Sequence, residues 1–293
     1  MHLNATDRGT VMNRIIACID GSPATRGVCD YAAWASLKLD TPISLLHVLD
    51  RKHYPADSDL SGTIGLGSRE HLLDELAKLD EKRRGLGLKQ GQLLLEAAQE
   101  HVTKLGAQKT DTLQRHGDFL DTLQDMQAQS ALLVMGRLGE ETPPERLIGS
   151  HLESALRALT RPILVTPVAF EIPQRAMLAF DNSNSARKAL EMMAESPLFQ
   201  DLECHIVTVG KDNAENRQPQ EDAATILRSI GLNVVTAIVE GDVELALEKY
   251  RKQQEIGLTV MGAYGHSRLR HFFMGSNTGN MLRTAGGALL VVR

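Results

Sequence analysis

Two blocks in the sequence have glycines at a spacing that suits the binding of a phosphate group. Each block begins with Gly-x-x-Gly directly after a short apolar run, and a Gly-Ser pair follows nine residues later. A glycine pair after a strand lets a ligand approach the main chain closely. A Gly-Ser pair at the start of a helix offers free N–H groups and a hydroxyl to an anion. The blocks comprise Gly136, Gly139, Gly149 and Ser150 and, at an offset of 126 residues, Gly262, Gly265, Gly275 and Ser276.

The two blocks belong to an internal repeat that covers most of the chain. The offset of 126 residues holds without a gap to the C-terminal end, whereas the segments around Asp20 and Asp181 match at an offset of 161. The first half must therefore contain a net insertion, which we place within 51–90. Repeats of this kind indicate duplicated structural units. We predict a poorly ordered tail at 1–12, a first domain at 13–168 with a long helical insertion at about 51–105, and a second domain at 173–293.

Short apolar runs alternate with helical segments in both halves, and this alternation is typical of a parallel sheet with helices on both faces. Right-handed crossovers then make each half a doubly wound α/β domain with five strands. Because a bare edge strand is an aggregation hazard, we expect the closing strands of the two halves, 163–166 and 288–292, to pair or abut. The other strands are expected at 14–19, 43–49, 112–115, 131–135, 176–180, 204–209, 233–239 and 258–261. Helices are expected at 23–38, 68–105 (in one piece or broken near Gly85-Leu86-Gly87), 118–128, 150–160, 184–195, 221–230, 242–253 and 276–284.

The composition of the 293 residues argues against several classes of protein. The net charge of −5 at pH 7 is unusual for a protein that binds nucleic acid. Three scattered cysteines, Cys18, Cys29 and Cys204, are too few for a disulfide framework or a zinc ribbon. No apolar run approaches the roughly 18 residues that span a bilayer, and residues 1–12 do not resemble a signal peptide. We therefore expect a cytoplasmic protein that binds neither nucleic acid nor membranes.

The carboxyl ends of the predicted strands indicate where a ligand binds. In open parallel sheets the site lies beyond these ends, at the point where the strand order reverses. Asp20 and Asp181 follow the first strand of each half, and Val48 and Val209 lie near the end of the second. Together with the glycine blocks, these residues predict a site for a ligand that has a flat apolar part and a phosphate tail.

Plainer interpretations of these residues stay open. The glycines could serve only to shape a turn and a helix start, and Ser22 and Ser183 are better explained as helix caps than as nucleophiles. Cys18 is interpreted as a small core residue, and His47 and His205 as core or rim residues. The sequence has neither a phosphate-binding P-loop nor a zinc-binding pattern. We therefore predict no catalytic residue and no metal ligand.

The sequence resembles the universal stress proteins. The resemblance is carried by Ile15–Ser22 (IIACIDGS), by Leu45–Val48 (LLHV) and by the two glycine blocks with their closing strands, and it covers nearly the whole chain. It implies a Rossmann-like fold of the adenine nucleotide alpha hydrolase type, present twice in tandem. The glycine motif implies the ATP-binding subgroup, with adenine near the end of the second strand and ribose and phosphates over the glycine loop. ADP and AMP are alternatives to ATP, and Mg can accompany the nucleotide.

The resemblance maps a nucleotide site onto each half. We expect the second site to be the stronger, because its spacer is basic, with Arg268 and Arg270, whereas the first spacer is acidic. Asn182 departs from the family pattern, which has a glycine after the aspartate. The stronger site is expected to comprise Ala179, Asp181, Val209, Met261, Gly262, Gly265, Arg268, Gly275, Ser276 and Asn277. The weaker site is expected to comprise Asp20, Val48, Gly136, Gly139, Gly149 and Ser150.

Three functions are consistent with these features. The first, which we predict, is a nucleotide-binding stress-response or regulatory protein with little or no turnover, because no catalytic base or P-loop lysine accompanies the phosphate site. The second is a slow ATP hydrolase or an adenylyl-transfer enzyme of the same fold. The third is an interaction protein with vestigial nucleotide sites. The two halves are expected to form an intramolecular pseudo-dimer, with a homodimer of the chain as a further option.

Overall fold

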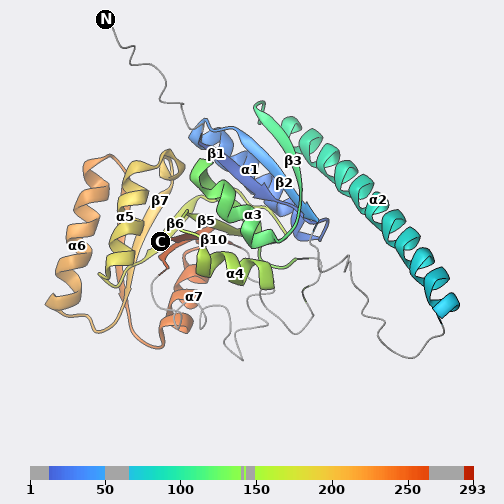
Figure 1. Ribbon diagram of the computed structural model, residues 1–293. Coiled ribbons are helices and arrows are strands. Elements are labelled where there is room, and N and C mark those ends of the chain that lie inside the picture. Colours follow the sequence, from blue (N-terminus) through green and yellow to red (C-terminus); the bar gives the residue numbers. More distant parts are fainter. Residues whose placement is uncertain (1–12, 50–65, 140–141, 143–148, 264–286) are drawn as a thin grey trace, which may run out of the picture.

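A ten-stranded sheet with helices on both faces forms the centre of the protein (Figure 1). The computed structural model describes residues 13–49, 66–139, 142, 149–263 and 287–293, without the side chains of 66–74 and 80. The strands of the first half are β1 (Arg14–Cys18), β2 (Ile43–Leu49), β3 (Thr110–His116), β4 (Ser130–Gly136) and β5 (Ile163–Thr166). Those of the second half are β6 (Arg175–Ala179), β7 (Glu203–Val209), β8 (Asn233–Val239), β9 (Leu258–Gly262) and β10 (Ala288–Val292).

The two halves contribute five strands each in the same relative order. The full order is β3-β2-β1-β4-β5-β10-β9-β6-β7-β8, so the halves mirror each other about the contact of β5 with β10. Strands within a half are parallel. At the contact the closing strands are antiparallel, and Leu164 pairs with Leu290. The predicted five-stranded parallel sheets and the pairing of the closing strands are therefore confirmed, and neither closing strand is left as a bare edge.

Helices cover the two faces of the sheet in two groups. The helices are α1 (Ala24–Leu39), α2 (Leu66–Lys104), α3 (Phe119–Met126), α4 (Ser150–Ala158), α5 (Asn184–Glu195), α6 (Ala214–Ser229) and α7 (Val243–Gln253), with 3-10 turns at Gln127–Gln129 and Pro197–Phe199. Successive residues of a strand alternate between faces. Ile15 and Ala17 of β1 therefore pack in the layer of α1, α2, α5 and α6, whereas Ile16 packs with α3 and α4 on the other face. Helix α7 packs on that second face in the other half.

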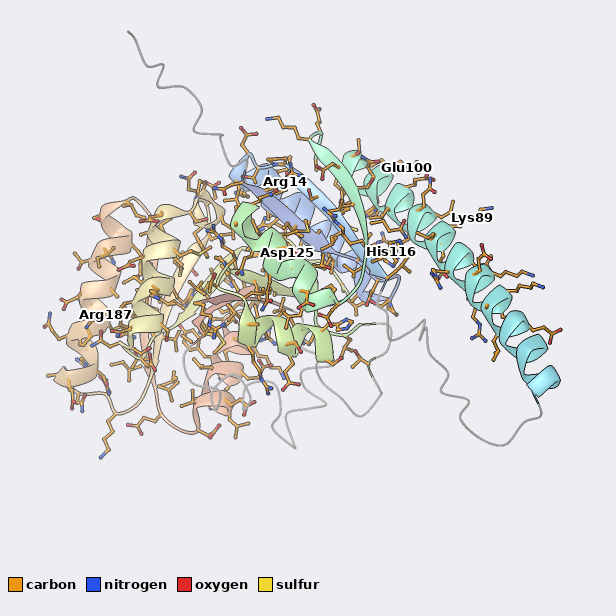
Figure 2. All side chains as sticks on the ribbon, viewed as in Figure 1. Arg14, Lys89, Glu100, His116, Asp125 and Arg187 are labelled. Carbon is orange, nitrogen blue, oxygen red and sulfur yellow. The ribbon has the colours of Figure 1, made fainter. Side chains whose placement is uncertain are left out.

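Helix α2 is the main difference between the two halves. It has 39 residues, whereas α6, which connects the corresponding strands of the second half, has 16. Figure 1 shows α2 beside β3, with its first turns extending past the end of the sheet. Lys89 and Glu100 project from the side of α2 that faces away from the sheet (Figure 2). None of the described helices is both long and apolar enough to cross a membrane.

Two helices differ from the sequence-based expectation. The sequence allows a helix that is continuous or broken near Gly85-Leu86-Gly87, and the structure has α2 in one piece through these residues. A glycine inside a helix costs roughly 0.5–1 kcal/mol relative to alanine. A Cβ on Gly85 would meet nothing within 4 Å, so the helical residues on either side keep α2 continuous here. The helix expected at 221–230 instead begins at Ala214, because the Asn213 side chain accepts a hydrogen bond from the amide of Asn216 and caps it. The helix expected at 276–284 lies outside the described residues.

Candidate functional site

A cavity of about 620 Å³ lies at the carboxyl ends of β1, β2 and β4. In the strand order β1 stands between β2 and β4, so this is the point at which the order of the first half reverses. We call it the first-half cavity. It brings together every predicted residue of the weaker site, namely Asp20, Val48, Gly136, Gly139, Gly149 and Ser150. Its wall also includes Ser22, His47, Gly87, Gln90, Gly91, Leu94, Phe119, Thr142 and His151.

Asp20 is held in place by the turn between β1 and α1. Its Oδ1 accepts hydrogen bonds from the amide of Ser22 at 3.0 Å and from Oγ1 of Thr25 at 3.4 Å. The turn needs Gly21 at φ +83°, a left-handed conformation that glycine adopts without steric cost. These bonds direct the other oxygen, Oδ2, toward the glycine loop, where a Cβ atom on Gly139 would lie 3.0 Å from it.

The three glycines of the first block leave room for different neighbours. A Cβ on Gly136 would lie 2.7 Å from Cβ of Ala24, so this glycine lets α1 pack closely on β4. The same reason holds for Gly262, where a Cβ would lie 2.4 Å from the backbone of Ser185. Gly139 and Gly149 instead lie together in the loop, and a Cβ on Gly149 would be 3.3 Å from the Gly139 amide nitrogen. The first glycine of each block therefore serves the packing of a helix on a strand, which is neither the turn nor the helix start of the plainer interpretation. Gly139 and Gly149 of the first block allow close contacts within the loop at the cavity wall.

The first turn of α4 faces the first-half cavity. Gly149 is its N-cap, with no side-chain capping bond, and its amide donates to the carbonyl of Arg137 at 3.0 Å. Ser150 and His151 follow and line the cavity. The ring of His151 stacks on Phe119 at 4.7 Å between centroids. The amide groups of a first helical turn and the helix dipole attract anions, so this end of the cavity suits a phosphate.

The opposite end of the cavity is lined by uncharged polar groups. A Cβ on Gly91 of α2 would lie 2.6 Å from Nδ1 of His47, so the Nδ1 edge of the imidazole packs against the helix. Nδ1 is buried and has no hydrogen-bond partner among the described residues. Burial lowers the pKa of His47 below its usual value of 6.5, so the ring is neutral at pH 7. No lysine or arginine occurs among the described lining residues.

The second half repeats part of this arrangement. Ala179 and Met261 are register partners at the ends of β6 and β9, Val209 ends β7, and Gly262 ends β9. The carboxylate of Asp181 accepts a hydrogen bond from the Ser183 amide at 3.1 Å, as Asp20 does from Ser22. The remaining predicted residues, Gly265, Arg268, Gly275, Ser276 and Asn277, lie outside the described residues, so the predicted order of the two sites stays a prediction.

The departure at Asn182 has a conformational explanation. Asn182 has φ +60°, in the same left-handed region as Gly21 in the first half. Asparagine tolerates this region better than other residues with a side chain. The turn after the aspartate therefore keeps its shape without the glycine.

The prediction that both serines cap helices is correct for only one of them. Ser183 accepts a hydrogen bond from the amide of Ala186 at 3.3 Å and caps α5. Helix α1 begins after Pro23 and has no side-chain capping bond. Ser22 is buried, and its Oγ has no hydrogen-bond partner among the described residues. In the first half, the Thr25 hydroxyl makes the side-chain hydrogen bonds of this turn instead: it accepts from the amide of Gly21 and donates to Asp20.

The three cysteines and His205 behave as core residues in the structure. Burial raises the pKa of Cys18, Cys29 and Cys204 to about 12, so all three are thiols at neutral pH. His205 is buried, with its Nδ1 2.8 Å from the Tyr250 hydroxyl, as expected for a core histidine. No group of three or more His, Cys, Asp or Glu side chains suited to a metal ion occurs among the described residues.

Comparisons with known proteins agree with this architecture. The Universal stress protein family model matches residues 12–167 and 208–293. Universal stress protein Slr1230 of Synechocystis sp. is 33% identical over 287 residues, which are 96% of this chain and 100% of that protein. A crystal structure of a universal stress protein from Archaeoglobus fulgidus is similar in fold, with a TM-score of 0.63, 19% identity and coverage of 96% of this chain and 98% of that one.

The fold and the cavity thus define a tandem Rossmann-like protein with a cavity at the carboxyl ends of its first-half strands. The chain belongs to the universal stress protein family.

Proposed function

We propose that the chain is a stress-response or regulatory protein that binds an adenine nucleotide in the first-half cavity. The observation that carries the proposal is the meeting of Asp20, Val48 and the glycine block around one cavity of about 620 Å³, with the first turn of α4 in its wall. A volume of 300–1,000 Å³ is usual for a small-molecule site. Apolar side chains at the ends of β2 and β4 offer a slot for the base, and the α4 terminus offers amides to a phosphate.

The charge of the first-half cavity wall affects how much each phosphate of a nucleotide adds to binding. Asp20 is an acidic group in the wall, and the described lining residues include neither lysine nor arginine. Phosphates beyond the first would therefore gain little from ion pairs in this half. AMP or ADP should bind the first-half cavity about as well as ATP, and Mg would be needed only to screen a longer phosphate chain.

We further propose a second nucleotide site at the end of β6, β7 and β9. Asp181, Val209 and Gly262 stand there as Asp20, Val48 and Gly136 stand in the first half. Its basic spacer favours ATP, which makes it the tighter of the two. The internal pairing of β5 with β10 is expected to serve as the dimer contact of this chain, so a homodimer is not needed to complete either site.

Little or no turnover is expected at either site. A fast ATPase needs a positioned base or water-orienting group and a cationic clamp on the γ-phosphate. One carboxylate oxygen of Asp20 accepts the hydrogen bonds of the β1–α1 turn, and the three cysteine thiols are protonated at neutral pH. These groups are therefore poorly suited to act as the base. The slow hydrolase or adenylyl-transfer enzyme stays the alternative, and an interaction protein with vestigial sites is the third.

The first experiment is to purify the full chain, denature it and identify any released nucleotide. Titration calorimetry with ATP and AMP then assigns each binding event to a half of the chain, by comparing the wild type with one variant in each half. Gly149→Asp fills the loop, because its Cβ alone would lie 3.2 Å from Oγ1 of Thr142, and should remove the first-half event. Gly275→Asp should remove the tighter event. The proposal fails if neither nucleotide binds, and the expected order of the sites fails if Gly149→Asp removes the tighter event. Turnover above about 1 per second with Mg would favour an enzyme.

A further inference from the structure

One wall of the first-half cavity comes from α2, which belongs to neither glycine block. Gly87, Gln90, Gly91 and Leu94 line the cavity. Their spacing of three, four and seven residues places them on one face of the helix. Lys89 projects from the opposite side of α2 in Figure 2. The long helix of the first half therefore forms part of the cavity wall and also covers β3.

Gly91 explains how α2 comes this close. A Cβ at this position would lie 2.3 Å from Nε2 of Gln114 and 2.6 Å from Nδ1 of His47. A side chain at residue 91 would require Gln114 and His47, or the helix itself, to shift. Gly87, one turn earlier, is also buried on this face. With both glycines in place, the side chain between them, Gln90, is brought to the edge of the cavity.

Gln90 has the chemistry to recognise a base. Its side chain is solvent-exposed in the wall, and a primary amide offers one acceptor and two donor hydrogens. Adenine presents an amino donor next to a ring-nitrogen acceptor, which a glutamine amide can match with two hydrogen bonds. Hypoxanthine presents an N–H beside a carbonyl, which the same amide matches after a half-turn, so hypoxanthine would not be discriminated. A purine that lacks the amino group keeps the ring-nitrogen acceptor alone, so one of the two bonds is lost. The neutral His47 beside Gln90 adds no charge that would favour a phosphate at this end.

We propose that the Gln90 amide hydrogen-bonds to the base of a nucleotide in the first-half cavity and makes this half selective for adenine over a purine without the amino group. The inference rests on the proposed function, because it assumes a nucleotide whose phosphate lies at the first turn of α4. It places a specificity-determining residue on the helical insertion. The second half is served by the much shorter α6, so selectivity of this origin is expected in the first half only.

The test compares AMP with purine riboside 5′-monophosphate, which differs from AMP only in lacking the amino group of the base. The full chain is titrated calorimetrically with each nucleotide as wild type, Gln90→Leu, Gln92→Leu and Gly149→Asp. Gln92 is the matched control, because it lies on the same helix and its amide donates to Glu96 at 3.0 Å. Gly149→Asp identifies nucleotide binding in the first-half cavity as the binding event that this variant loses. The midpoint of thermal unfolding of each variant shows whether it is folded.

In the wild type we expect AMP to bind the first half about fivefold more tightly than purine riboside monophosphate, since one hydrogen bond is worth roughly 1 kcal/mol. Gln90→Leu removes two hydrogen bonds from AMP and one from purine riboside monophosphate, so it should reduce their affinities about 25-fold and about fivefold and bring the ratio to within twofold. Gln92→Leu should keep both values. If Gly149→Asp removes AMP binding but Gln90→Leu keeps the wild-type ratio, the inference is overturned and the proposed function stands. If no binding is lost in Gly149→Asp, both are overturned.

Discussion

Asp20 and Gly139 lie side by side in the wall of the first-half cavity, where a Cβ atom on Gly139 would be 3.0 Å from Oδ2 of the aspartate. The contact joins the end of β1 to the loop after β4. In the sequence these residues are more than a hundred positions apart. The missing side chain at Gly139 is what leaves room for the carboxylate at the cavity edge.

The variant Gly139→Ala tests this relationship. The added methyl group would press on Asp20 more closely than an ordinary van der Waals contact, so the carboxylate or the loop must shift. We expect the AMP affinity of the first half to fall about threefold to tenfold, on the order of 1 kcal/mol, as measured by calorimetry. The control is Gly136→Ala, whose methyl meets Ala24 and should lower the free energy of unfolding by about 1–3 kcal/mol. Unchanged AMP binding in Gly139→Ala would show that this spacing does not matter to the ligand.

Two glycines of α2 should respond to alanine with opposite signs. A Cβ on Gly85 would meet nothing within 4 Å, so Gly85→Ala should raise the free energy of unfolding by about 0.5–1 kcal/mol through helix propensity alone. Gly91→Ala gains the same propensity but drives its methyl into His47 and Gln114, and overpacking of this kind costs about 1–3 kcal/mol. Denaturant unfolding of both variants measures the difference. A stabilised Gly91→Ala would mean that α2 does not pack as closely on β2 as described.

The sequence predicts the first-half site because its signals are local. Asp20, Val48 and Gly136 each follow or end a buried apolar run, and parallel strands bring such positions to one edge of the sheet. Gln90 and Gly91 carry no comparable signal, because their place in the wall depends on how a long helix packs on β2 and β3. Gly85 shows the same effect, since its local preference for a break is overridden by the helix around it.

Ser22 and Ser183 occupy matching positions in the repeat but should differ in their effect on stability. Ser183→Ala removes the cap of α5 and should lower the free energy of unfolding by about 1 kcal/mol. Ser22→Ala removes a buried hydroxyl that has no hydrogen-bond partner among the described residues, so it should leave stability unchanged or raise it slightly. Urea unfolding of the two variants makes the comparison. Equal losses would mean that Ser22 caps α1 in solution.

The lowered pKa of His47 predicts how stability depends on pH. Burial is the main cause, with His116 acting in the same direction and the negative charge of Asp20 opposing both. The unfolded chain therefore takes up a proton at His47 near pH 6.5, before the folded chain does. A state that binds more protons is favoured as pH falls, so this residue contributes a loss of stability below about pH 6.5 and none above it.

The variant His47→Gln removes this contribution of His47 to the pH dependence of stability. We expect the free energy of unfolding of the wild type, relative to His47→Gln, to be constant from pH 8 to pH 7 and to fall from pH 6.5 to pH 5.5. Urea unfolding of both proteins at each pH measures this difference in free energy of unfolding. Because both proteins contain the other histidines, the contributions of those histidines cancel in the difference. A wild type that gains stability over the variant at low pH would mean that His47 is held in its charged form, paired with Asp20.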